Sequence, residues 1–143
     1  MSYAAIAEFP KCTAYNNADQ VITGINSVSF NTHSYDTDNI HPLSSPSVFT
    51  CQTAGTYQIC ANIRVSANTT KYQVTIQVTQ SGVTHMISEA ESPASGGTAD
   101  FVVTAQCQLA KNDTVYIQVD NLGTYTVIHQ DVAQPSFSMT KLP

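Results

Sequence analysis

Apolar and polar residues alternate with period two along most of this chain, and helical periodicity is almost absent. The pattern is clearest over residues 56–66, where Tyr57, Ile59 and Ile63 share one face. Alternation sends successive side chains to opposite faces, so each such segment predicts a strand with one buried face. Further strand patterns cover residues 21–35, 48–52, 72–79, 101–109, 115–119, 125–129 and 136–142. Tight Gly, Pro, Asn and Ser turns between them predict an all-β antiparallel sandwich or jelly roll.

The chain length of 143 residues suits one domain with its own core. Residues 21–143 hold every predicted strand and form the predicted jelly-roll domain. Residues 1–20 are predicted to be an N-terminal arm outside the sandwich, because the Phe9-Pro10 step cannot continue regular strand pairing. The longest predicted loops are residues 36–46 and 89–100, and loops are where a binding function is usually placed.

Charged residues make up only 10% of the chain, and its net charge is −5. The five cations stand singly along the sequence, so no basic stripe follows a phosphate backbone and we expect no nucleic-acid partner. The outward strand positions carry Thr, Gln, Ser and Asn where a solvated sheet normally carries Lys and Glu. Two interpretations remain open: a preference for uncharged polar residues, or faces covered by other chains. We favour self-association.

Four cysteines (Cys12, Cys51, Cys60 and Cys107) are too far apart for a CxxC redox or zinc pattern. If all four were oxidised, three pairings would be possible, and the sequence does not choose among them. Cys107 lies in an alternating apolar run and is predicted to be a buried, inert thiol. Residues 1–17 lack a basic leader, and no segment has the length of a membrane span, so we expect synthesis in a cytoplasm and no membrane partner.

Two carboxylate pairs are the main candidates for chemistry. Asp36 and Asp38 face one way on an extended segment, and beside Asn39 and His41 they are calcium candidates. The alternative is that each carboxylate caps nearby backbone N–H groups, which we favour. Glu89 and Glu91 form a second pair, but without an aromatic pocket a solvated loop is the better interpretation.

The remaining polar residues give no catalytic pattern. The histidines lack any metal-ligand spacing, although two of them flank the Asp36–Asp38 pair; the four are His33, His41, His85 and His129. The chain has no G-x-S-x-G elbow, no Cys–His nucleophile pair and no phosphate-binding glycine loop. We therefore predict no enzymatic activity and no cofactor beyond the calcium candidate.

The run from Phe49 through Gly55, Tyr57 and Ile59 resembles the signature of the complement-component-1q globular head, a family grouped with the tumour-necrosis-factor-like jelly rolls. In this pattern the aromatic and apolar side chains fill the sandwich and Gly55 turns between two strands. The stretch Tyr35-Asp36-Thr37-Asp38 is similar to prokaryotic and phage members. Phe137, in Ser136-Phe137-Ser138-Met139, resembles the family's last strand. The resemblance extends over about residues 21–142.

The resemblance implies a ten-stranded jelly-roll protomer in a threefold homotrimer that binds or assembles and does not catalyse. Phage proteins of this kind serve as tail tips or as decoration (cement) proteins on capsids. With no fibre shaft or collagen-like repeat in the chain, the expectation is a capsid decoration protein on the outer surface of a virion, bound to major capsid protein subunits. Gln77 and Tyr116 are the expected trimer-face residues. The expected docking residues of the arm are Tyr3, Ile6, Phe9 and Tyr15.

Two alternatives remain open. A trimeric receptor-binding or glycan-binding tip would place recognition in the loops 36–46 and 89–100. A free trimeric ligand-binding module of a bacterium is the third possibility.

Overall fold

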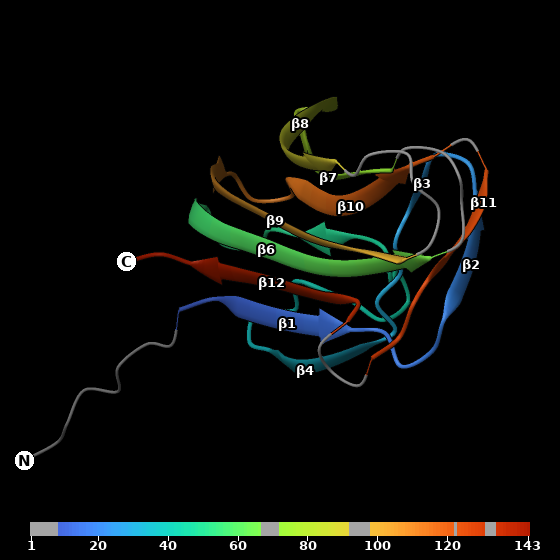
Figure 1. Cartoon of the computed structure of the whole chain (residues 1–143). Helices are drawn as coiled ribbons and strands as arrows, with labels where there is room; N and C mark the ends of the chain where they lie inside the picture. The colour runs from blue at the N-terminus through green and yellow to red at the C-terminus, as the bar shows by residue number, and fades with distance from the viewer. Residues whose placement is uncertain (1–8, 67–71, 92–97, 122, 131–133) are drawn as a thin grey trace, which may run out of the picture.

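The computed structural model describes residues 9–66, 72–91, 98–121, 123–130 and 134–143, which form two antiparallel sheets packed as a sandwich (Figure 1). The seven-stranded sheet contains β1 (Lys11–Tyr15), β2 (Gln20–Thr23), β4 (Thr32–Asp36), β6 (Gly55–Ser66), β9 (Thr98–Leu109), β11 (Thr124–Val127) and β12 (Ser136–Lys141). The five-stranded sheet contains β3 (Asn26–Ser27), β5 (Phe49–Thr50), β7 (Gln73–Gln80), β8 (Val83–Glu91) and β10 (Thr114–Asp120). The predicted all-β sandwich is confirmed.

Strands far apart in the sequence are neighbours in both sheets. The seven-stranded sheet runs β2-β11-β6-β12-β1-β4, and β9 pairs with β6. The five-stranded sheet runs β3-β10-β7-β8, and β5 pairs with β10. Because Lys11 of β1 pairs with Thr140 of β12, the start of the first strand and the end of the last strand lie at the same end of the sandwich (Figure 1). We call this the terminal end.

The core lies where the alternation predicted it. In β6 every second residue from Tyr57 to Val65 is buried, while the residues between them are half-buried. The same alternation holds in β10, where Val115, Ile117 and Val119 are fully buried. Period-two patterning therefore located the inward faces of the central strands correctly, since register in a sandwich is fixed by which face is buried.

The signature aromatics meet inside the sandwich. The Phe49 and Phe137 rings stack with centroids 3.6 Å apart, and Phe30 meets the Phe49 ring edge-on at 5.6 Å. The Tyr57 ring is buried, and its hydroxyl donates a hydrogen bond to the carbonyl of Thr53 at 2.7 Å. A buried tyrosine needs such a partner for its hydroxyl, so Tyr57 also holds the turn that precedes β6.

Gly55 does not lie in the turn where it was expected. It is the first residue of β6 and pairs with Leu109 of β9, and among the described glycines those with positive φ are Gly24 and Gly82. A Cβ at position 55 would lie 2.5 Å from Cε of Lys141. The absence of a side chain at Gly55 thus makes room for the lysine of the last strand to cross this corner.

The arm expected over residues 1–20 is wrong for its second half. Residues 11–15 form β1, which lies inside the seven-stranded sheet between β12 and β4. Cys12 and Ala14 are fully buried in this strand. Pro10 stands just before the strand, where its missing N–H breaks no pairing, so its presence did not argue against β1.

Two further expectations of strand position need correction. Residues 21–35 are three short strands, β2, β3 and β4, with Gly24 at φ 76° in the first connection. The expected loop 89–100 is shorter than predicted, because β8 continues to Glu91 and β9 begins at Thr98. Strand β8 was not predicted because most of its residues are exposed, and because a register shift opposite Ile76 and Gln77 interrupts the alternation of apolar and polar residues.

Candidate functional site

The outward face of the seven-stranded sheet is an uncharged surface built across neighbouring strands. Its middle row joins Thr104, Cys60, Ser138 and Thr13 in direct cross-strand register. The rows on either side join Gln106, Gln58 and Thr140, and Val102, Asn62, Ser136 and Tyr15. Side chains in direct register lie on the same face of a sheet. We call these eleven residues the polar face.

Charge is confined to the two margins of the polar face. Lys11 pairs with Thr140 at the terminal end. At the opposite end the Arg64 guanidinium lies 3.8 Å from the Asp100 carboxylate. A solvated sheet normally carries Lys and Glu across its middle, whereas the centres of protein interfaces lack charge. The polar face therefore shares its lack of charge with the centres of interfaces.

Strand β9 gives the same indication at the edge of this sheet. It is 12 residues long, and within the described part of the chain it pairs with β6 alone. Val102 in its middle is 61% exposed. Edge strands in monomers are usually shortened, bulged or guarded by lysine, because an open edge templates pairing with other chains. β9 has none of these features over residues 101–109.

The thiols do not supply a nucleophile. All four cysteines are free, with Cys12 and Cys51 buried and Cys60 and Cys107 half-buried. Burial raises the pKa of each thiol, that of Cys12 to about 12. A thiol with a raised pKa stays protonated at neutral pH and is a poor nucleophile. Cys107, which was predicted to be buried, is only half-buried.

Gln77 and Tyr116, the expected trimer-face residues, lie opposite each other on the outward face of the five-stranded sheet. Met86 continues their row on β8 and is 51% exposed. The Gln77 amide donates a hydrogen bond to the Thr75 hydroxyl at 2.9 Å. These two residues therefore form a cross-strand pair on the sheet that does not carry the polar face.

Asp36 and Asp38, the calcium candidates, bind groups of the protein itself. The two carboxylate oxygens of Asp36 accept hydrogen bonds from the backbone N–H groups of Ile40 at 2.8 Å and His41 at 2.7 Å. Oδ2 of Asp38 accepts one from the Thr53 hydroxyl at 2.9 Å. Asp36 thus makes the backbone caps that the sequence analysis weighed against calcium for both residues, and it holds the start of the 37–48 segment in place, whereas Asp38 binds a side-chain hydroxyl.

The other acidic pair also turns to a neighbouring side chain. The Gln73 amide donates hydrogen bonds to Glu89 and Glu91, which face the same way on β8. Across the described ranges no three His, Cys, Asp or Glu side chains gather as metal ligands would. In the same ranges no helix is long and apolar enough to cross a membrane.

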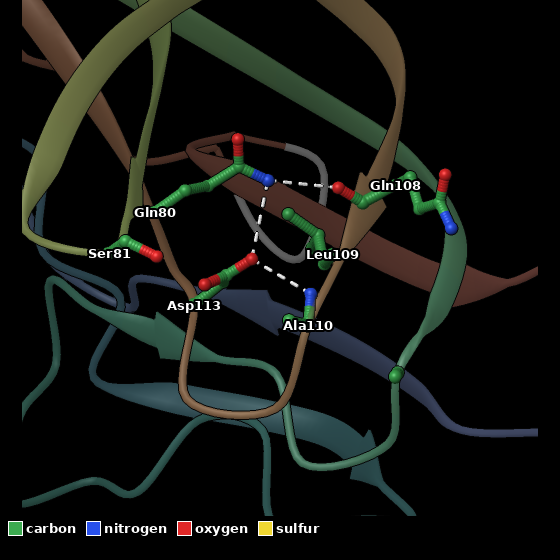
Figure 2. Close-up of a pocket in the computed structure, with 7 residues that line it drawn as sticks. Gln80, Ser81, Gln108, Leu109, Ala110 and Asp113 are labelled. Atoms are coloured by element: carbon green, nitrogen blue, oxygen red, sulfur yellow. Dashed lines mark hydrogen bonds between the residues drawn. The ribbon is translucent and has the colours of Figure 1, made fainter.

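A shallow hollow lies at the terminal end, and the polar groups that line it hydrogen-bond to one another (Figure 2). Its volume is about 430 Å³, and the side chain of Asp113 reaches into it from the β9–β10 turn. Oδ2 of Asp113 accepts hydrogen bonds from the Ala110 N–H at 2.8 Å and the Gln80 amide at 3.2 Å, and that amide also reaches the Gln108 carbonyl. These hydrogen bonds hold the β9–β10 turn in place and occupy the Asp113 carboxylate and the Gln80 amide, which are therefore not free to bind a ligand.

A second open groove, of about 550 Å³, lies between β2 and β3. Its lining is uncharged and consists of Gln20, Val21, Ile22, Thr23, Asn26, Ser27, Ser29 and Ser47. The Gln20 amide fixes its floor with two hydrogen bonds to the backbone of Ser29, at 2.8 and 2.9 Å. No pattern in the sequence indicated this groove, because residues 20–29 and 47 come together only in the fold.

Two aromatic rings with lysines over them mark the terminal end. The Lys141 ammonium lies 5.5 Å from the centroid of the Phe9 ring, and that of Lys11 lies 5.2 Å from the Tyr35 ring. Phe9 and Tyr35 are 46% and 43% exposed. Of the expected docking residues, Phe9 belongs to this group, and Tyr15 is in β1 on the polar face. Tyr3 and Ile6 lie outside the described residues.

Comparisons with solved structures give the same fold. Murine APRIL has a TM-score of 0.74 at 7% identity, with 94% of this chain and 100% of that chain covered. The globular domain of zebrafish complement 1qA has a TM-score of 0.67 at 16% identity, with 94% and 98% covered. Eiger TNF from S. frugiperda has a TM-score of 0.75 at 9% identity, with 96% and 94% covered. None of these three is a phage or bacterial protein. No curated protein matches the chain.

A family comparison extends the likeness to the sequence. The C1q domain model matches residues 12–138, from β1 to β12. C1q/TNF-like domains are non-enzymatic binding modules and are usually homotrimeric. The chain therefore belongs to the C1q domain family.

Proposed function

We propose that this chain is a binding module that closes into a homotrimer through its polar face and the open edge of β9. One observation carries the proposal: the middle of a seven-stranded sheet presents eleven uncharged residues where a solvated sheet would carry Lys and Glu. Three copies around an axis would cover the faces and the unpaired edges together. The polar face, rather than Gln77 and Tyr116, is the trimer face in this proposal.

Arginine substitutions on the two sheets test this assignment. Thr104→Arg and Ser138→Arg place a charge in the middle row of the polar face, whereas Gln77→Arg places the same charge on the other sheet. In sedimentation velocity the wild type and Gln77→Arg should have three times the 15.4 kDa mass of one chain. Thr104→Arg and Ser138→Arg should sediment as folded monomers. Circular dichroism checks that each variant remains folded.

Two results would overturn the trimer proposal. A wild type that sediments as a stable monomer removes the trimer altogether. If Gln77→Arg dissociates while both polar-face variants stay trimeric, the association uses the five-stranded sheet. Thr104 is exposed on an edge strand, so its variant keeps the test decisive even where Ser138→Arg fails to fold.

The specific role that we propose is decoration of a virus capsid, on the outer surface of the virion, with major capsid protein subunits as partners. The terminal end supports it. Both ends of the described chain lie at this end of the sandwich. Two partly exposed aromatic rings, those of Phe9 and Tyr35, lie there beneath lysines, although the chain has only five cations. In a trimer three such ends would point the same way, so weak contacts would add up on a repetitive surface.

Binding to purified particles tests the decoration role. The double variant Phe9→Ser, Lys141→Gln should remain trimeric and lose binding to particles from the source culture. A variant of the opposite end, Asn26→Ala, should bind them like the wild type. If the double variant still binds, the terminal end is not the docking site, and absence of the wild-type chain from all particles removes the capsid role.

A glycan-binding or receptor-binding tip is the second candidate function, and the groove between β2 and β3 favours it. Amide and hydroxyl groups line it without any charge, which suits a neutral saccharide. Asp36, where the first of the two expected tip loops begins, pairs with Cys12, whereas Thr98, near the end of the second loop, pairs with Ser66 toward the opposite end of the seven-stranded sheet. Loss of host adsorption in Asn26→Ala, with particle attachment intact, would favour this function.

A further inference from the structure

The segment 37–48, which connects β4 to β5, is fastened to the core by one buried histidine. His41 is 0% exposed, and its ring stacks on Phe49 with centroids 4.4 Å apart and planes 17° from parallel. Phe49 in turn stacks on Phe137 of the opposite sheet. The imidazole is therefore the outer member of an aromatic stack that crosses the sandwich. We call residues 37–48 the strap.

The two ring nitrogens of His41 are in different situations. Nε2 lies 2.9 Å from the carbonyl oxygen of Pro46. A carbonyl oxygen only accepts, so Nε2 carries the hydrogen and Nδ1 is the unprotonated nitrogen. Nδ1 is buried and has no hydrogen-bond partner in the described parts of the chain. A proton added there would create a buried cation whose new N–H has no acceptor, which is strongly unfavourable.

Two titratable groups of β4 act on the ring. His33 lies edge-on to it, with centroids 6.0 Å apart, and its cation would repel a second one. Asp36 attracts a cation, but both of its oxygens already bind the backbone N–H groups of Ile40 and His41. Burial is the largest effect and lowers the pKa of His41; His33 lowers it further, while the Pro46 carbonyl and Asp36 oppose the change.

We propose that His41 is a proton-operated latch, whose neutral ring holds the strap against the sandwich and whose protonated ring leaves the core and releases it. Release would expose the face of the Phe49 ring and break the backbone hydrogen bonds that hold both ends of the strap. Among these are the Thr50 N–H to the Ile40 carbonyl at 2.7 Å and the Phe30 N–H to the Pro46 carbonyl at 2.9 Å. The latch lies within one chain and does not depend on the trimer.

The direction of the pH dependence follows from linkage. The released ring has the ordinary pKa of 6.5, and the buried ring has a lower one, so the open state binds the proton more tightly. The strap is held fully above pH 6.5. Below it the opening equilibrium should rise with a slope that approaches about tenfold per pH unit, until the pH reaches the pKa of the buried ring.

Amide hydrogen exchange of the whole chain measures the opening. The amides to follow are Ile40, His41, Thr50 and Phe30, between pH 7.5 and 5.0, corrected for the intrinsic pH dependence of exchange. The range stops at pH 5.0 because Asp36 caps two of these amides. His41→Gln keeps an amide donor for Pro46 and removes the titration. His129→Gln is the matched control, because the His129 ring also contacts a carbonyl, that of Asn16 at 2.8 Å.

In the wild type and in His129→Gln, protection of these four amides should fall about fivefold between pH 6.5 and 5.5. In His41→Gln it should be independent of pH. The latch is overturned if the protection of these amides in the wild type does not change with pH. It is also overturned if their protection falls equally in His41→Gln. If His41→Gln does not fold, NMR titration of the wild-type His41 ring decides. A ring that titrates at 6.5 or above while the strap stays protected contradicts the proposal.

Discussion

Phe49 is the residue on which the two sheets and the strap all pack. It is fully buried, and its ring contacts those of His41, Phe30 and Phe137. Phe49→Ala should lower the free energy of unfolding by about 3–5 kcal/mol, because it removes a large buried ring and leaves a cavity. Urea unfolding of Phe49→Ala and of Phe9→Ala, whose ring is half-exposed, measures the difference. A loss below about 1 kcal/mol at position 49 would contradict the packing described here.

Asp36 is predicted to act through its hydrogen bonds and not through a metal. Asp36→Ala removes the acceptor of two part-buried N–H groups and should cost about 1–3 kcal/mol of stability. Asp38→Ala, which loses one exposed contact with Thr53, should cost less. Thermal unfolding of the wild type with calcium and with EDTA should give the same midpoint. A midpoint that rises with calcium in the wild type and not in Asp36→Ala would make this residue a ligand.

Among the strands and their connections, Gly82 in the β7–β8 hairpin and Gly55 at the start of β6 are glycines for different reasons. Ser81 and Gly82 have φ of 50° and 78°, so both turn residues are left-handed, as in a type I′ hairpin. Gly82→Ala should cost about 1 kcal/mol from backbone strain, although its Cβ would meet no atom.

Gly55→Ala is the comparison, since its φ is not positive and its Cβ would meet the Lys141 stem. The double variant Gly55→Ala, Lys141→Ala should recover the stability that Gly55→Ala loses, whereas Lys141→Ala should not rescue Gly82→Ala. Chemical denaturation of the four variants measures both effects. If Lys141→Ala restores nothing at position 55, the close approach is not the reason for the glycine.

For the whole molecule, the uncharged polar face predicts how the proposed trimer responds to salt. An interface held by ion pairs weakens as salt screens it, whereas one formed by neutral polar and apolar groups does not. The dissociation constant of the trimer should therefore stay the same or fall between 50 mM and 1 M NaCl. Sedimentation equilibrium measures it. Dissociation at high salt would mean that margin charges such as Arg64 and Asp100 hold the chains together.

The fold was more predictable than the candidate site, for a reason visible in particular residues. Alternation marked Gln58, Cys60 and Thr104 as outward positions, and the structure agrees. Nothing in one strand says which strands adjoin it, so β1 was predicted as an arm and the rows of the polar face were not predicted. The rows that define the polar face join residues more than a hundred positions apart, such as Thr13 and Ser138.

The sequence by itself determined the fold class, the inward faces of the central strands and the family signature from Phe49 to Ile59. These depend on period-two burial and on short-range turns, which are written in neighbouring residues. Capping by Asp36 was also favoured from the sequence, because its partners Ile40 and His41 are only four and five residues away. Only the tertiary structure decided that β1 joins the sheet and that His41 lies buried in a stack with Phe49 and Phe137. Each of these depends on groups that meet through non-local strand pairing, and the burial of a polar side chain follows from the whole sandwich around it.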